Sequence, residues 1–270
     1  MNIIDTVRSR RSVRTFNGEP LKKEDIDQIS DFARETVNPY NLPISWMVFN
    51  TEESGLSTPV IVGEDTYIAG KMLRAEHAEE AFGYSFERIV LFAESIGIGT
   101  TWIAGTMNRS SFEKAVSLAE NEVMPCVSPL GYPAKKMSVR ETVMRKGVKA
   151  DSRFDFSDIF FDGSFDIPLK SESAGKLQTA LEAVRLAPSA VNKQPWRVAV
   201  CDNCVHFYEK RSKARAEGEW DIQKIDMGIA LCHFELVAAE CGLNVSFCIE
   251  DPGLPVGENT VYIASYKLND

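Results

Sequence analysis

The densest group of cationic side chains lies near the start of the sequence. Arg10, Arg11 and Arg14 surround Ser12, and Phe16 follows as an apolar anchor. Arginine guanidinium groups donate paired hydrogen bonds that suit a phosphate, and a serine hydroxyl adds a short donor. Many basic runs are only solvated helix faces. Because the surrounding protein is acidic, with a net charge of −9, we interpret this run as a local anion-binding site.

A second polar segment, residues 186–196 with the sequence LAPSAVNKQPW, lies between an expected helix and an expected strand. Its two prolines flank Ser189, Asn192 and Gln194. An ordinary helix-to-strand loop also contains such turn-forming residues. Three neutral hydrogen-bonding side chains on a segment stiffened by prolines nevertheless favour the polar edge of a planar, neutral ligand over a charged one.

A third segment, residues 97–106 with the sequence GIGTTWIAGT, is rich in small residues. Its glycines suggest a dinucleotide-binding loop at first sight. They follow a helix instead of a strand, however, and no helix opens directly on them, so the Rossmann context is missing. Ala104 and Gly105 instead allow the backbone to approach a flat ligand closely.

Hydrophobic periodicity predicts the elements that hold these segments. In the first half we expect an amphipathic helix, two short strands, a deeply buried helix and a third strand, over residues 21–34, 45–50, 59–63, 84–96 and 127–131. Gly97 ends the buried helix. The basic stretch 135–153 is interpreted as a solvated connection. Residues 51–71 and residues 67–72 are candidates for a cover over a ligand cavity.

The same order of elements begins again in the second half. A helix opened by Pro168, a strand that starts at Trp196 and a nearly all-apolar helix over 225–239 follow at an offset of about 148 residues. This order indicates an internal duplication with a pseudo-two-fold relation, in a mixed α+β fold. Because the two apolar helices need each other for burial, we expect the halves, residues 1–153 and 154–270, to intertwine as one structural domain.

The composition argues against several classes of function. The excess of acidic residues disfavours a broad surface for nucleic acid or for an anionic membrane. No window approaches the roughly eighteen consecutive apolar residues of a transmembrane helix. The six cysteines occur without a signal peptide, so we expect a reduced, cytoplasmic protein that folds without disulfides.

The remaining candidate residues have simpler explanations than a metal or catalytic site. Cys201 and Cys204 lie near His206, but no second cysteine pair follows at zinc spacing. The Asp-Asn pair between the cysteines is typical of a hairpin turn. We therefore expect no metal. His233 is interpreted as a satisfied interior histidine and not a catalytic base. Residues 226–228 are interpreted as helix packing, and His77 as part of a solvated helix face.

Taken together, the three segments resemble the FMN-dependent nitroreductase superfamily. The RRSVRTF start, the GIGTTWIAGT run and the PSAVNKQPW loop match that family in order and type, and the resemblance covers essentially the whole sequence. The sequence is similar to the branch in which the usual homodimer is collapsed into one chain. The resemblance therefore implies a nitroreductase-like fold of two fused half-repeats, and a monomer.

The resemblance implies that the first segment binds FMN, with Arg10, Arg11 and Ser12 at the phosphate and Arg14 at the pyrimidine edge of the flavin. Arg153 resembles the family's C-terminal phosphate-binding arginine. A second basic residue usually precedes that arginine by two positions. This sequence has Asp151 there instead, and Lys149 is the nearest replacement.

The resemblance assigns the flavin ring and ribityl chain to the other two segments. Ser189, Asn192 and Gln194 would contact them from the second half, and the small residues of the third segment would lie against the ring near N5. The complete set of further contact residues is Pro188, Ala190, Ile103, Ala104 and Gly105.

A comparison of the two halves predicts one FMN per chain. The counterpart of the PSAVNKQPW loop is residues 39–46, PYNLPISW, which lacks the spacing of Ser, Asn and Gln. The counterpart of the arginine segment is residues 162–166, DGSFD, whose two acids would repel a phosphate. One complementary pair of segments therefore remains.

The activity that the resemblance implies is an NAD(P)H-dependent reductase with a ping-pong scheme. Hydride would pass through flavin N5 to a nitroaromatic, a quinone or a similar small acceptor, so no protein residue is assigned as catalytic. The alternative is a flavin-binding protein without turnover, a sensor or carrier, because the same binding segments would serve it.

Overall fold

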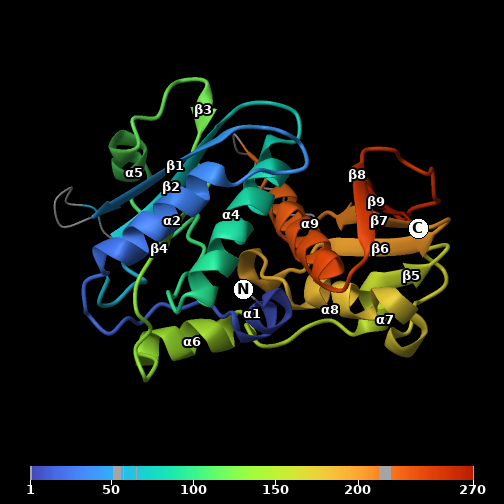
Figure 1. The fold of residues 1–270 in the computed structure, drawn as a ribbon, viewed down its shortest axis with the longest axis horizontal. Coiled ribbons are helices and arrows are strands. Elements are labelled where there is room, and N and C mark those ends of the chain that lie inside the picture. Colours follow the sequence, from blue (N-terminus) through green and yellow to red (C-terminus); the bar gives the residue numbers. More distant parts are fainter. Residues whose placement is uncertain (1, 51–55, 57, 65, 213–219, 270) are drawn as a thin grey trace. The chain divides into compact units, whose positions relative to one another are not determined.

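The computed structural model describes residues 2–50, 56, 58–64, 66–212 and 220–269. The chain divides into two compact units. Unit 1 comprises residues 1–2, 9–78 and 85–150, and unit 2 comprises residues 3–8, 79–84 and 151–270. Both units combine a sheet with helices, which confirms the mixed α+β fold (Figure 1).

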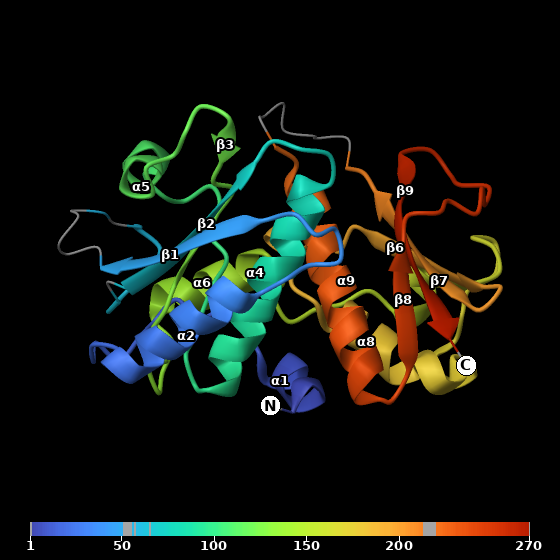
Figure 2. The same cartoon turned by 45° about the horizontal axis from the view of Figure 1, so that its top comes forward.

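Unit 1 is built around a four-stranded sheet in which β2 (Thr66–Leu73) is central. This strand pairs antiparallel with β1 (Ile44–Asn50), β3 (Glu122–Val123) and β4 (Val127–Pro129). Helix α2 (Lys23–Glu35) packs on β1 (Figure 2). The other helices are α4 (Ala78–Ser95), α5 (Arg109–Ala115) and α6 (Val139–Gly147), and residues 79–84 of α4 belong to unit 2.

Unit 2 contains a five-stranded sheet in the order β5-β6-β7-β9-β8. Only β5 and β6 are parallel; the other neighbours are antiparallel. The strands are β5 (Phe160–Asp162), β6 (Trp196–Cys201), β7 (Cys204–Lys210), β8 (Asn244–Cys248) and β9 (Thr260–Asn269). The helices are α1 (Ile3–Ser9), α7 (Phe156–Ile159), α8 (Gln178–Leu186), α9 (Ile222–Glu240) and the short 3-10 turns η1 (Ser171–Ser173), η2 (Gly175–Leu177) and η3 (Ala190–Asn192).

Helix α9 is the central helix of unit 2. It lies beside β6, β7, β8 and α8 (Figures 1 and 2). Most of its side chains are buried, as the apolar sequence predicts. Gly228 allows a close approach to the first part of α4, because an added Cβ would lie 2.0 Å from the backbone oxygen of Glu80. Gly83 allows the same close approach from α4, because a Cβ added there would lie 2.0 Å from the backbone oxygen of Ile225 in α9. The two backbones therefore cross at glycines.

The long helices end in the same way in both halves of the sequence. Gly97 and Gly242 follow α4 and α9 with φ of +81° and +75°. In each case the next amide, that of Ile98 or Leu243, donates to a carbonyl five positions back, at 2.8 and 2.9 Å. This is the Schellman arrangement of a helix C-terminus. The repeated order of helix, hairpin and long capped helix supports the predicted duplication.

Two predictions about the region between β1 and β2 are wrong. Residues 59–63 form no strand: Val62 makes one isolated bridge with Thr15, and Gly63 turns with φ +79°. Residues 67–72 are not a cover but part of β2. This strand is buried on both faces, so its sequence lacks the alternation that marks a half-exposed strand. The proposed cover also includes residues 51–55, 57 and 65, which lie outside the described residues.

The predicted solvated connection at 135–153 contains helix α6. Ser138 caps this helix, and its Oγ accepts a hydrogen bond of 3.1 Å from the Glu141 amide. The sequence Ser-Val-Arg-Glu is a capping-box pattern that signals a helix start. His77 was also wrongly placed on a solvated helix face: it precedes α4 with φ +61° and stacks on Tyr40 at 5.2 Å.

Candidate functional site

The arginine segment of unit 1 is surrounded by buried carboxylates. Arg10 Nε lies 3.8 Å from Oε1 of Glu87, a fully buried residue of α4. The other oxygen of Glu87 accepts a hydrogen bond of 3.0 Å from Trp102 Nε1. Arg11 Nη1 lies 3.1 Å from Glu141 Oε1 in α6. Each of these arginines is therefore oriented by an acidic side chain from a helix.

Arg14 is the third cation of this segment and is partly buried. Burial lowers its pKa, the nearby Glu141 carboxylate raises it, and Arg145 lowers it again. Three arginines thus face two buried carboxylates, Glu87 and Glu141. The segment keeps an excess of positive charge, which fits an anionic ligand.

The structure brings the arginine segment and the glycine-rich segment together within unit 1. The Val13 amide donates to the Thr100 oxygen at 2.8 Å, and Ser12 forms a parallel bridge with Thr100. An added Cβ on Gly99 would lie 3.0 Å from Val13 side-chain atoms, so the two backbones approach closely. The sequence predicted both segments as ligand contacts but did not predict this pairing.

The residues expected near flavin N5 lie along the same segment. Ile103 pairs its backbone with Val127 through two bonds of 2.9 Å. The Ala104 oxygen accepts a hydrogen bond of 2.8 Å from Arg109 Nη2. Gly105 is exposed, and an added Cβ there would meet nothing within 4 Å. The fold of the chain therefore does not itself require a glycine at this position.

The PSAVNKQPW loop of unit 2 has an unusual backbone. Val191, Asn192 and Gln194 adopt φ of +45°, +58° and +50°. Val191 is β-branched and 65% exposed, so packing of its side chain does not compensate the strain. Ser189 Oγ closes the loop by accepting a 2.8 Å hydrogen bond from the Gln194 amide. Such strained segments persist where surrounding contacts hold them, and they cluster at functional sites.

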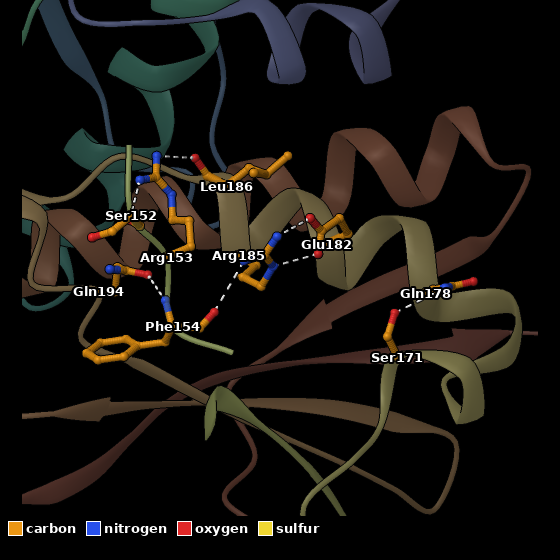
Figure 3. A network of polar contacts seen from close by, with 9 residues as sticks. All are labelled: Ser152, Arg153, Phe154, Ser171, Gln178, Glu182, Arg185, Leu186 and Gln194. Carbon is orange, nitrogen blue, oxygen red and sulfur yellow. Dashed lines mark hydrogen bonds and ion pairs between the residues drawn. The ribbon is translucent and has the colours of Figure 1, made fainter. Parts of the chain in front are cut away.

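Arg153 holds this loop from the start of unit 2 (Figure 3). Its Nη2 donates to the Leu186 oxygen at 3.1 Å, and its Nη1 lies 3.4 Å from Asn192 Oδ1. The Phe154 amide donates to Gln194 Oε1 at 3.0 Å. Arg153 was predicted from the resemblance to bind phosphate; in this structure its guanidinium bonds to the Leu186 oxygen at the end of α8 and to the Asn192 side chain in the loop.

A neighbouring ion pair continues the network in Figure 3. Arg185 makes two hydrogen bonds to Glu182, at 2.7 and 2.6 Å, and its Nη1 donates to the Phe154 oxygen at 3.3 Å. Pairing with Glu182 raises the pKa of Arg185. The end of α8 is thereby fastened to the segment that carries Arg153.

Asp226 is a residue of this region whose role the sequence did not predict. Its Oδ1 accepts a hydrogen bond of 2.9 Å from the Ala190 amide, inside the loop. The interpretation of residues 226–228 as helix packing holds for Gly228, but Asp226 also contacts the loop. The available signal was an acidic residue in a helix that is otherwise apolar, because a buried carboxyl needs a partner.

The predicted site residues fall into two groups. Unit 1 contains Arg10, Arg11, Ser12, Arg14, Ile103, Ala104 and Gly105, and unit 2 contains Arg153, Pro188, Ser189, Ala190, Asn192 and Gln194. Within each unit, the segments that carry these residues are connected by the contacts described above.

The counterparts of these segments are engaged in the chain's own turns. The Asn38 amide group donates to the Leu42 oxygen at 2.7 Å and to Ser85 Oγ at 3.2 Å. The Ser164 amide donates to the Asp162 oxygen at 2.7 Å, across Gly163 with φ +68°. No arginine accompanies this second turn in the sequence.

The cysteine motif forms the predicted hairpin. Cys201 and Cys204 are opposite each other at the ends of β6 and β7, and Asp202 and Asn203 turn with φ of +49° and +57°. His206 Nδ1 bonds to Ser265 Oγ at 2.6 Å. Among the described residues no group of three or more His, Cys, Asp or Glu side chains could hold a metal ion.

His233 is an interior residue, as predicted, and its Nδ1 lies 2.9 Å from the Ala183 oxygen. Within the described part of the chain, no helix is both long enough and apolar enough to cross a membrane.

The fold is that of a nitroreductase. The structure of a putative nitroreductase from Thermotoga maritima matches 100% of this chain and 95% of its own length, with a TM-score of 0.62 and 22% sequence identity. The sequence also matches the family described as "Putative TM nitroreductase" over residues 2–238. The chain therefore belongs to this family, which confirms the resemblance and supports an oxidoreductase.

Shorter matches cover about half of the chain. An FMN-dependent nitroreductase from Clostridium difficile R20291 matches 53% of this chain and 95% of its own, with 17% identity and a TM-score of 0.43. A putative NADH oxidase from Clostridium acetobutylicum matches 50% and 89%, with 22% identity and a TM-score of 0.41. A search of curated proteins finds no match to the sequence.

Proposed function

We propose that this chain is an FMN-dependent NAD(P)H oxidoreductase that reduces a nitroaromatic, a quinone or a similar small acceptor. The observation that carries the proposal is the strained Ser189–Gln194 loop in a chain of the nitroreductase family. The loop keeps three non-glycine residues in the left-handed region, and contacts from Arg153, Phe154 and Asp226 hold them there. Backbone strain concentrated in one surface loop favours a role in ligand binding.

The arginine segment is proposed to bind the FMN phosphate. Arg10 and Arg11 are oriented by Glu87 and Glu141, so their remaining N–H groups are preorganised as donors. Ser12 adds a hydroxyl to the same segment. This donor set fits a phosphate dianion, because the arginines outnumber the carboxylates. Arg14 is proposed to contact the pyrimidine edge of the flavin.

The loop of unit 2 is proposed to contact the ribityl chain and the ring of a flavin through Ser189, Asn192 and Gln194, with Pro188 and Ala190 beside them. Neutral amide and hydroxyl groups suit these parts of FMN, which are polar but uncharged. Arg153 is proposed to fix the loop and to offer its guanidinium towards the phosphate. The backbone of Ile103, Ala104 and Gly105 is proposed to lie against the ring.

The chemistry that FMN supplies when bound is hydride transfer at N5. The residues of this chain bind and orient, and none is proposed as a nucleophile or as a general base. NAD(P)H is proposed as the electron donor. We further propose that the protein acts as a monomer in the cytoplasm, with one FMN per chain.

The test is an absorbance spectrum of the purified protein followed by turnover assays. We expect a flavin absorbance band at about 450 nm that is present in the purified protein or is restored by added FMN. We also expect oxidation of NADH or NADPH by a nitroaromatic or a quinone. FMN binding without oxidation of either donor would favour the non-catalytic flavin-binding protein. Absence of a flavin band after reconstitution would refute both.

A further inference from the structure

Asp226 is buried in α9 and accepts a hydrogen bond from the Ser189–Gln194 loop, which is proposed to contact the flavin. Its side chain belongs to a residue that is 2% exposed, and Oδ1 accepts the Ala190 N–H at 2.9 Å. Among the described residues, Oδ2 is buried and has no hydrogen-bond partner. An ionised carboxylate in such a place would carry a large desolvation penalty.

The charges around Asp226 also disfavour its ionised form. Asp221, at the start of α9, and Glu209, in β7, both add negative charge near it. The nearby cations are already paired, Arg211 with Glu209 at 3.3 Å and Lys224 with Glu80 at 3.7 Å. Burial, with these acids, raises the pKa of Asp226 well above its usual range, although the Ala190 bond opposes the rise. Burial and these acids therefore favour the neutral form of the Asp226 carboxyl.

The position of Asp226 is fixed by the backbone on which it stands. Gly228 lies half a turn further along α9 and touches the backbone of residues 80–84. The residue before Asp226, Ile225, is in turn approached by Gly83. Because both glycines permit close contact, this part of α9 cannot shift without opening the helix crossing.

The loop needs such a fixed partner. Ala190 directly precedes Val191 and Asn192, the first two residues with positive φ. A non-glycine residue in a sparsely populated backbone region is strained, and it persists only where the surrounding structure holds it. An acceptor on a rigid helix, immediately before the strained residues, restrains the backbone where the unusual conformation begins.

We propose that Asp226 is a positioning residue whose buried carboxyl holds the Ser189–Gln194 loop in its left-handed conformation and thereby preorganises it for FMN. The proposal rests on the proposed function for the identity of the ligand. Its first half, control of the loop, concerns the chain alone and is measured without flavin.

The experiment compares Asp226→Asn, Asp226→Ala and a control, Asp202→Asn, which makes the same chemical change at an exposed turn of unit 2 where φ is +49°. Hydrogen exchange at the Ala190 amide is measured by NMR in flavin-free protein, and FMN affinity by fluorescence titration. Loss of the bond in Asp226→Ala is expected to speed Ala190 exchange and weaken FMN about tenfold. Asp226→Asn keeps the acceptor and the neutral charge, so both values should stay near wild type, as in the control.

The outcomes separate the two proposals. If wild-type protein binds no FMN, the proposed function fails, but faster Ala190 exchange in Asp226→Ala still supports control of the loop. Unchanged exchange in Asp226→Ala would overturn the positioning role whatever the flavin result. If Asp226→Ala does not fold, Asp226→Asn decides: wild-type protection and affinity support a neutral acceptor, and a loss of either contradicts it.

Discussion

Arg11 illustrates how one side chain can serve both the fold and a ligand. It is partly exposed, yet its partner Glu141 is buried, with the second carboxylate oxygen lacking a hydrogen-bond partner in the described structure. Truncation of Arg11 would therefore remove a proposed phosphate donor and also leave a buried carboxylate unpaired. A change in flavin binding alone would not distinguish these effects, so stability and affinity have to be measured separately.

We predict that Arg11→Ala weakens FMN about 10- to 100-fold and lowers the free energy of unfolding by about 2 kcal/mol. Adding Glu141→Gln should restore most of the stability but not the affinity, because the phosphate donor is still missing. Urea denaturation and flavin titration measure the two effects. Riboflavin, which lacks the phosphate, is the matched ligand: its affinity should change little, and an equal loss for both flavins would contradict the phosphate assignment.

The buried carboxyl of Asp226 predicts a pH dependence of stability. Its folded-state pKa is raised above the value of about 3.9 in an unfolded chain, so folding takes up a proton between the two values. The stabilising contribution is complete below the unfolded pKa and is lost as the pH rises through the folded pKa. Asp226→Asn should therefore gain stability relative to wild type as the pH is raised above about 4.

Urea denaturation of both proteins at a series of pH values measures this difference, and Asp202→Asn is the control for a surface carboxyl. A difference between wild type and Asp226→Asn that stays constant across a series starting below about pH 4 would show that the pKa of Asp226 is the same in the folded and unfolded states, against the raised pKa inferred from its burial.

At the scale of elements, the sequence predicts the helices better than the strands. The helices at 21–34, 84–96 and 225–239 are confirmed because long apolar periodicity leaves few alternatives. Strand β2 was missed because both of its faces are buried, and because Gly70 and Lys71 interrupt its apolar run. Helix α6 was missed because its sequence is polar, although its capping pattern was present.

The sequence indicates which residues are candidates for the site, but it does not indicate which other side chains contact them. The arginine, glycine-rich and PSAVNKQPW segments stand out through composition and turn residues. The carboxylates of Glu87, Glu141 and Asp226 come from helices distant in the sequence, and periodicity cannot indicate which buried acid meets which loop. Positive φ at Val191 was equally unpredictable, since β-branched residues disfavour it.

The helix crossing in unit 2 makes a prediction at this scale. Gly228→Ala should lower the free energy of unfolding by about 1–3 kcal/mol or more, because the added Cβ meets backbone and not a flexible side chain. Gly147→Ala, at the end of α6, is the control: nothing lies within 4 Å of its added Cβ, so stability should be unchanged or rise slightly. Thermal unfolding of both variants measures this, and similar losses in the two would contradict the close crossing.

At the scale of the whole molecule, the two halves of the sequence have kept their elements and lost their chemical equivalence. Both halves have a hairpin and a long helix with the same glycine cap. Only one half has the arginine segment, and only the other has the loop with Ser, Asn and Gln. The duplication is therefore visible in the elements, whereas the proposed site depends on what each copy retained.

We predict one FMN for each chain of 30.1 kDa. Flavin released by denaturation is quantified against protein concentration, and light scattering on the same sample gives the mass of the particle. The expected result is a 1:1 ratio in a particle of one chain. A ratio of two would mean that residues 39–46 and 162–166 retain a site despite their altered sequence.

Unit 2 is built from three separate segments of the chain, and this has a consequence for dividing the protein into fragments. Residues 79–84 complete this unit through Gly83 and its neighbours, although most of the unit follows residue 150. A polypeptide that began at residue 151 would lack that stretch and would expose the part of α9 around Gly228 that the stretch covers. Fragments 1–150 and 151–270 should therefore give little folded protein when they are expressed separately, but they should assemble when they are co-expressed. The segment around residue 150 is thus a suitable place to divide the chain for a split-protein reporter.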